Sequence, residues 1–206
     1  MNIIDLSHNL INKGPTYPSD PELSIIKEKD LEENRSMLHS ISFGTHTGTH
    51  IDVPAHMIRG GKTLDEFSLD SFMGIAVKVN NNNYKSLIDF NKNYDTVIYD
   101  TRWYRNYNEP DIFFGNNRPI IPENLISILI KKEIKIFGCD LPSVDVSGNK
   151  DKIVHNSFLK QNIILYESLT NLQSLPILTP FQFIGLPLPL VGLDGSPTRA
   201  IGIINN

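Results

Sequence analysis

The segment from His39 to Pro54 constrains the fold more than any other part of the chain. It is poor in residues that favour helices. Its β-branched side chains share the odd positions: Thr45, Thr47, Thr49, Ile51 and Val53. A period of two is typical of an extended strand, in which successive side chains point to opposite faces. We therefore predict one long extended segment here, in a chain that is rich in strands.

The even positions of the same segment carry side chains that bind metals. Within residues 46–56 they are His46, His50, Asp52 and His56. Imidazole and carboxylate groups are ligands of first-row metals, and several of them converging from a short stretch can form a site. In an extended strand all four would project from one face. The alternative is a chance gathering of core or surface histidines, which this clustering disfavours.

The spacing of the first two histidines requires a bend. A regular strand would separate His46 from His50 by about 13 Å, because each residue advances it by about 3.3 Å. Two ligands of one ion, each bound at about 2 Å, cannot be that far apart. Gly48 lies midway, and glycine tolerates the backbone of a bulge or tight bend. We therefore predict a kink at Gly48, because Gly44 and Pro54 disfavour the helix that would also pair the two histidines.

Composition excludes several classes of protein. The 206 residues are 40% hydrophobic and 20% charged, as in globular domains rather than disordered or collagen-like chains. The net charge of -4 gives no basic surface for nucleic acid. The sequence has no basic leader and no apolar run approaching about 20 residues. We therefore expect a cytoplasmic protein with no nucleic-acid or membrane partner, and its single cysteine, Cys139, cannot form a disulfide within the chain.

Patterns of strands and helices are mixed along the rest of the chain. Further strands are predicted over residues 3–6, 23–27, 74–79, 96–101, 134–137, 163–166, 181–190 and 199–204. A short helix should follow Thr63, which forms a capping box with Glu66, and longer helices are predicted over 122–132 and 151–161. Residues 194–197 have the composition of a turn that reverses the chain before the last strand. With no repeat or linker, we predict a single α/β domain over residues 1–206.

The run from His46 to His56, HTGTHIDVPAH, resembles the signature of the metal-dependent cyclase/hydrolase family that includes bacterial kynurenine formamidase and isatin hydrolase. The likeness extends to residues 5–7, 17–21, 138–145, 187–190 and 194–200, and therefore spans nearly the whole chain. It implies a swivelling β/β/α domain, in which a mixed twisted β-sheet is flanked by helices. It also implies a homodimer or homotetramer, with the segment through Pro21 as a candidate arm across the interface.

The resemblance further implies a site with two metals. His46, His50 and Asp52 would bind the first metal, and Asp52 would bridge to the second. His155 and Glu167 would complete the second site, because the segments around them resemble the family's second-metal segments. Members similar to isatin hydrolase lack this second pair, so its presence favours two metals. The ligand types suit Zn²⁺, with Mn²⁺ as the alternative.

This ligand set favours hydrolysis of an amide or formamide. A divalent metal lowers the pKa of bound water from 15.7 to about 7. His56, which the resemblance makes the acid/base, could take a proton from the attacking water and return it to the leaving amine. We therefore predict an arylformamidase-like hydrolase that acts on C–N bonds other than peptide bonds in a small-molecule carbonyl substrate. The chain has no Gly-x-Ser-x-Gly elbow, and Cys139 lacks the local signature of a nucleophile.

Two other functions remain open at this point. The same metals could serve a ring-opening hydrolase or a cyclase acting on a lactam, a lactone or a polyketide-like carbonyl. Alternatively, the chain could be a structural metal-binding module, which a closed metal shell with no position for water would favour. His56, which stands outside the implied ligand set, argues against that last alternative. For Arg199, a salt bridge is the simplest interpretation.

Overall fold

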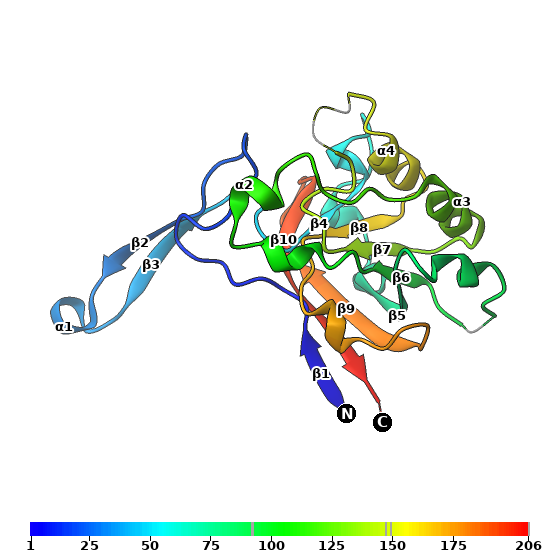
Figure 1. The fold of residues 1–206 in the computed structure, drawn as a ribbon. Coiled ribbons are helices and arrows are strands. Elements are labelled where there is room, and N and C mark those ends of the chain that lie inside the picture. Colours follow the sequence, from blue (N-terminus) through cyan, green and yellow to red (C-terminus); the bar gives the residue numbers. More distant parts are fainter. Residues whose placement is uncertain (92, 147, 149, 206) are drawn as a thin grey trace.

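The computed structural model describes residues 1–91, 93–146, 148 and 150–205. Among them, a mixed eight-stranded β-sheet forms the centre of the molecule (Figure 1). In spatial order its strands are β1 (Asn2–Asp5), β10 (Gly195–Ile204), β4 (His50–Asp52), β8 (Ile164–Glu167), β7 (Ile136–Cys139), β6 (Thr96–Tyr99), β5 (Met73–Val79) and β9 (Phe181–Pro187). The sheet curls back on itself because β10 also pairs with β9. This is the mixed α/β fold that the sequence predicts.

The strands β5 to β8 lie side by side and parallel in the sheet. Every residue of β6, β7 and β8 is buried, as expected for parallel strands that are covered on both faces. On one face, helices α3 (Glu123–Lys131) and α4 (Ile153–Leu159) pack Leu125, Leu129 and Phe158 into a core with the strands. On the other face, the curled sheet encloses a second core that includes Tyr166 and Phe183. The two cores hold β4 and β8 in place.

The remaining helices are short. They are α1 (Leu31–Asn34), α2 (Pro110–Phe113) and the 3₁₀ turns η1 (Pro54–His56), η2 (Leu64–Glu66), η3 (Leu69–Phe72), η4 (Tyr84–Ile88), η5 (Trp103–Asn106) and η6 (Leu172–Ser174). The predicted capping box is confirmed at η2, where Thr63 and Glu66 satisfy each other's backbone N–H groups. Among the described residues, no helix is long and apolar enough to cross a membrane.

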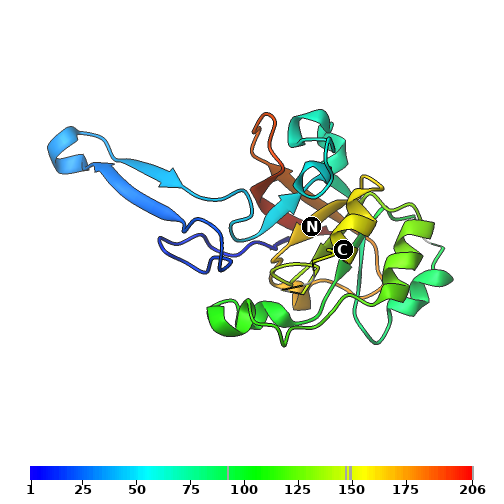
Figure 2. The same ribbon diagram turned by 90° about the horizontal axis from the view of Figure 1, so that it is seen from above.

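A two-stranded arm projects away from the body (Figures 1 and 2). It consists of β2 (Ser24–Lys29) and β3 (Leu38–Ser42), which pair antiparallel and are joined through α1. All of β3 and most of β2 are exposed. The segment through Pro21, which the resemblance makes a candidate arm, begins within the central sheet as β1, and farther along it the ring of Tyr17 contacts Phe114 edge-on.

The segment 39–54 is not one long strand, so that prediction is wrong. β3 ends at Ser42, the chain turns over residues 45–49, and β4 covers only His50–Asp52. The predicted kink is present, because Gly48 has a φ of +64°. The prediction that all four metal-binding side chains share one strand face is also wrong, since Pro54 begins the 3₁₀ turn η1. Residues that converge here do so from a turn, a strand and a short helix.

The turn predicted over residues 194–197 is also misplaced. The chain reverses at 191–192, where Gly192 has a φ of +74°, and β10 already begins at Gly195. Pro197 lies opposite His50 in the pairing of β10 with β4. Pairing with β4 thus outweighs the local preference of these residues for a turn. Arg199 forms the expected salt bridge, with Asp5.

Candidate metal centre

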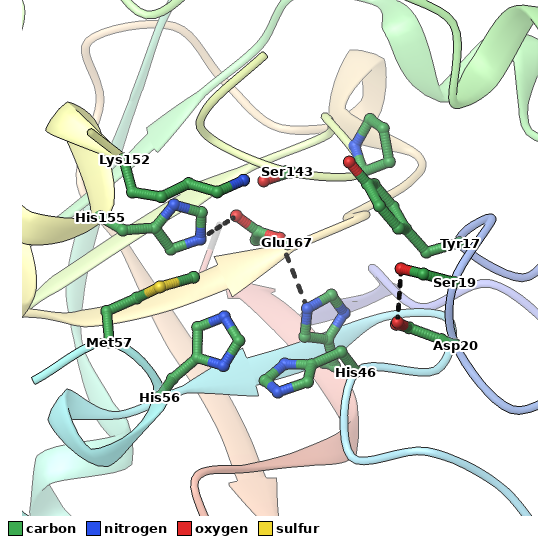
Figure 3. A pocket seen from close by; sticks show the side chains of 12 residues that line it. Tyr17, Ser19, Asp20, His46, His56, Met57, Ser143, Lys152, His155 and Glu167 are labelled. Atoms are coloured by element: carbon green, nitrogen blue, oxygen red, sulfur yellow. Dashed lines mark hydrogen bonds and ion pairs between the residues drawn. The ribbon is translucent and has the colours of Figure 1, made fainter. Parts of the chain in front are cut away.

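The six site residues predicted from the sequence come from separate elements and meet at one place. Figure 3 labels four of them, His46, His56, His155 and Glu167. Their positions are His46 in the turn before β4, His50 and Asp52 on β4, His56 at the end of η1, His155 on α4 and Glu167 at the end of β8. The antiparallel pairing of β4 with β8 places His50 directly opposite Glu167. Sheet register therefore joins the residues of the motif to a carboxylate more than a hundred positions later in the chain.

Four of these side chains form what we call the buried group: His50, Asp52, His155 and Glu167. Each is at most 4% exposed. His50 Nε2 lies 3.5 Å from Asp52 Oδ1 and 3.4 Å from Glu167 Oε2. His155 Nε2 lies 3.5 Å from Asp52 Oδ2 and 3.4 Å from Glu167 Oε1. Two imidazoles thus face two carboxylates across gaps longer than a hydrogen bond.

The rim group, His46, His56 and Asp194, is more exposed. The exposed fractions of these side chains are 18%, 21% and 37%. His46 Nδ1 lies 2.7 Å from Asp52 Oδ1, and its Nε2 lies 2.9 Å from Asp194 Oδ2. His56 Nδ1 is 3.2 Å from the same Asp194 oxygen. In contrast to the buried group, the rim group is joined by hydrogen bonds.

Each of the four imidazoles has one ring nitrogen held by an acceptor that is not among the six predicted site residues. His50 Nδ1 donates to the Gly48 carbonyl at 2.9 Å, and His155 Nδ1 donates to Asp145 Oδ2 at 2.7 Å. Asp194 accepts from the rings of both His46 and His56. Carbonyl and carboxylate partners of this kind are typical of metal-binding histidines, because they fix the tautomer and the ring orientation.

The charges of the centre favour a cation. Burial raises the pKa of Asp52, but His46 and the other imidazoles lower it by a larger amount, so the net shift is downward. The pKa of Glu167 is also lowered: burial and Asp52 raise it, but the nearby imidazoles of His155 and His50 outweigh them. Burial lowers the pKa of His46, whereas Asp52 and Asp194 raise it to about 10. The carboxylates are therefore ionised at neutral pH, deep in the protein.

Two observations show that the buried group fits a divalent metal. Asp52 Oδ2 is buried and has no hydrogen-bond partner among the described residues. A buried oxygen without a donor calls for another partner, such as an ion. Ligands bound at about 2.1 Å in a tetrahedron are about 3.4 Å apart, and the four imidazole-to-carboxylate distances in the buried group are 3.4 to 3.5 Å. The donor types and their spacing therefore both suit a metal.

Asp52 belongs to both sets of donor atoms that could hold an ion. One set is His46, Asp52 and His56, and the other is His50, Asp52 and Glu167; within each, the donor atoms lie within 4.8 Å of one another. This grouping differs from the one expected from the sequence, which places His46 beside His50 and His155 beside Glu167 and leaves His56 outside. His155 belongs to neither set. The position of Asp52 between the two sets suits a bridging carboxylate.

Sequence reasoning missed two carboxylates of this centre, Asp145 and Asp194. Asp145 is buried and accepts hydrogen bonds from the backbone and the ring of His155. Asp194 was assigned to a turn because of its Asp-Gly-Ser-Pro context. The hydrogen bonds of Asp194 to His46 and His56 lower its pKa. Both residues lie in segments that resemble the family, which was the one available signal.

The centre opens into a cavity of about 170 Å³. Other residues that line it include Tyr17, Ser19, Asp20, Met57, Ser143 and Lys152 (Figure 3). Tyr17 and Met57 provide apolar surface, and Lys152 provides a cation. A cavity of this kind could admit part of a small substrate beside the metal-binding side chains.

The chain is similar in sequence to known proteins along most of its length. A family model described as "Putative cyclase" matches residues 4–146. Kynurenine formamidase from Geobacillus thermodenitrificans is 31% identical over 96% of this chain and 95% of its own length. Kynurenine formamidase from Salinibacter ruber is 30% identical over 98% of this chain and 97% of its own length.

Solved structures share the fold at lower sequence identity. Isatin hydrolase A from Ralstonia solanacearum is similar with a TM-score of 0.85 at 20% identity, over 99% of this chain and 92% of that one. A predicted metal-dependent hydrolase from Bacillus stearothermophilus is similar with a TM-score of 0.77 at 21% identity, over 98% of this chain and 97% of that one. These likenesses confirm the arrangement of strands and helices around the centre.

Proposed function

Because the chain belongs to the cyclase family, we propose that it is a metal-dependent hydrolase of the kynurenine formamidase type. It acts on a C–N bond that is not a peptide bond, in a small-molecule substrate. The observation that carries this proposal is the buried group, in which ionised Asp52 has an oxygen with no hydrogen-bond partner among the described residues. Full-length relatives named kynurenine formamidase support the reaction class.

The proposed cofactor is a pair of divalent metals per subunit, with Zn²⁺ favoured and Mn²⁺ as the alternative. His46, His50 and Asp52 would hold the first metal. Asp52, His155 and Glu167 would hold the second, so that Asp52 is shared. When bound, such metals supply Lewis acidity, which activates water and polarises a carbonyl.

His56 is the proposed acid/base. Its ring lies on the rim, where Asp194 holds Nδ1, and Nε2 is the nitrogen proposed to transfer the proton. The oxygen of water attacks the carbonyl carbon, and His56 accepts the proton that this oxygen loses. The C–N bond then breaks, and His56 returns the proton to the leaving amine nitrogen, which releases the amine and a carboxylic acid such as formate.

The setting of the reaction is part of the proposal. Residues 1–206 would act as one domain, in the cytoplasm and without a nucleic-acid or membrane partner, and the buried free thiol of Cys139 fits a reducing compartment. The chain would form a homodimer or homotetramer, supported by the exposed Ile26, Leu38 and Ile41 on the arm. Light scattering that gives only the 23.3 kDa mass of one chain would contradict the oligomer.

Hydrolysis of N-formylkynurenine by the full chain tests the function directly. The protein is purified without chelators, and turnover is measured before chelation, after chelation and after addition of Zn²⁺ or Mn²⁺. We expect turnover that disappears with the metal and returns with it. A metal-loaded protein that leaves N-formylkynurenine intact but opens lactams or lactones would replace the formamidase proposal with the ring-opening alternative.

A further inference from the structure

We propose that Asp194 is a positioning residue that fixes the two rim imidazoles, His46 and His56, in the orientation that hydrolysis requires. The inference rests on the proposed function, in which His46 is a metal ligand and His56 is the acid/base. Asp194 lies immediately before β10, 138 positions after His56 and 148 after His46. The residue would thus couple a ligand to the group that moves the proton.

A single oxygen of Asp194 serves both rings. Oδ2 accepts from His46 Nε2 at 2.9 Å and from His56 Nδ1 at 3.2 Å. The second nitrogen of His46 is then directed at Asp52, with Nδ1 at 2.7 Å from Oδ1. The ring centroids of the two histidines are only 4.1 Å apart, so the orientation of one ring limits the other. Rotation of either ring would break a bond to the shared oxygen.

The segment that carries Asp194 is anchored to the elements beside the centre. The carbonyl of Asp194 accepts from the backbone N–H of Val53, next to β4, at 3.1 Å. The carbonyl of Leu193 accepts from Leu64 N–H at 3.0 Å. One position earlier, the Gly192 N–H donates to Asp65 Oδ1 at 2.8 Å. Three consecutive residues are therefore attached to the body, which gives the carboxylate a fixed position.

Gly195 supplies the space that this arrangement needs. A Cβ atom at residue 195 would lie 2.8 Å from His46 Cε1 and 2.6 Å from the carbonyl oxygen of Ile51. Real side chains do not approach so closely, so even alanine would displace the His46 ring or the strand. The pair Asp194-Gly195 therefore acts on His46 from two sides: the carboxylate holds the ring, and the glycine leaves room for it.

Removal of the carboxylate tests the positioning role. Asp194→Ala and Asp194→Asn are compared with Asp70→Asn, which makes the same change of carboxylate to amide on the exposed turn η3. We expect kcat to fall about 10- to 100-fold in the Asp194 variants, with little change in KM. Asp194→Glu should recover part of the loss, because it keeps the carboxylate. Circular dichroism of each variant verifies the fold.

Two further measurements do not depend on the substrate. The ¹⁵N shifts of the imidazole nitrogens report which nitrogen of His56 carries the proton, and elemental analysis reports metal content. In the parent chain we expect the proton on His56 Nδ1, and Asp194→Ala should redistribute it between the two nitrogens. Gly195→Ala should lower metal occupancy through His46. If Asp194→Ala leaves the His56 tautomer and kcat as in Asp70→Asn, the positioning role is wrong, whether or not N-formylkynurenine is the substrate.

Discussion

The buried group and the rim group contain the same types of side chain but differ in contact and in solvent exposure. In the buried group, side chains that are at most 4% exposed face one another across 3.4 to 3.5 Å. In the rim group, side chains that are 18% to 37% exposed are joined by bonds of 2.9 to 3.2 Å. A metal ligand benefits from a dry, fixed setting, whereas a proton carrier must reach substrate and solvent. Burial therefore sets His56, the proposed proton carrier, apart from the proposed ligands of the buried group, while His46 is a proposed ligand that lies on the rim.

Asp52→Ala should have the largest effect. The substitution removes the one carboxylate that belongs to both sets of donor atoms, so both metals and all detectable turnover should be lost together. Metal content and hydrolysis are measured on the same preparation. The matched control is Asp20→Ala, because Asp20 lines the cavity but belongs to neither set. Retention of both metals in Asp52→Ala would contradict the claim that Asp52 is shared between the two metal sites.

His56→Ala should have the next largest effect. Loss of a general acid/base typically lowers kcat by about 10²- to 10⁴-fold. The buried group is unchanged in this variant, so the metal content should stay close to that of the parent chain. A steady-state comparison of kcat and KM at neutral pH measures the loss. A variant with unchanged kcat would show that the proton travels by another route.

Removal of the metal from the parent chain should lower its stability against unfolding, an effect smaller than the losses of turnover described above. A metal that binds only the folded chain, at about 1,000 times its Kd, adds about 4.1 kcal/mol to the free energy of unfolding. For a chain of this size, that corresponds to a Tm shift on the order of 10 °C. Thermal unfolding with and without chelator should show the shift in the parent chain and in His56→Ala. Asp52→Ala should show none, and a shift there would place the ion elsewhere.

Local patterns predicted much of the fold and the cluster of His46, His50, Asp52 and His56, whereas His155 and Glu167 came from the family resemblance. The capping box at Thr63, the helix after Pro122 and the kink at Gly48 each depend on residues close in sequence, and each is present. The even-numbered spacing wrongly predicted that His56 shares a strand face with His46, His50 and Asp52. The strand ends before His56, because Pro54 begins a 3₁₀ turn. A period of two describes a strand and carries no information about where that strand ends.

The two missed carboxylates depend on distant contacts. Asp194 reaches His46 across 148 positions, through the pairing of β10 with β4. Asp145 reaches His155 through the first turn of α4. Neither residue lies in a periodic pattern or a spacing typical of metal ligands, so composition alone favoured a turn for Asp194. Sheet register and packing of the loops against the centre give these residues their partners.

Elemental analysis of metal per subunit in Glu167→Ala and His56→Ala is the most direct test of the division between the buried group and the rim group. Our account predicts two metals in the parent chain and in His56→Ala, and one in Glu167→Ala, where the buried group loses a carboxylate. Loss of metal from His56→Ala, or an unchanged content in Glu167→Ala, would contradict it.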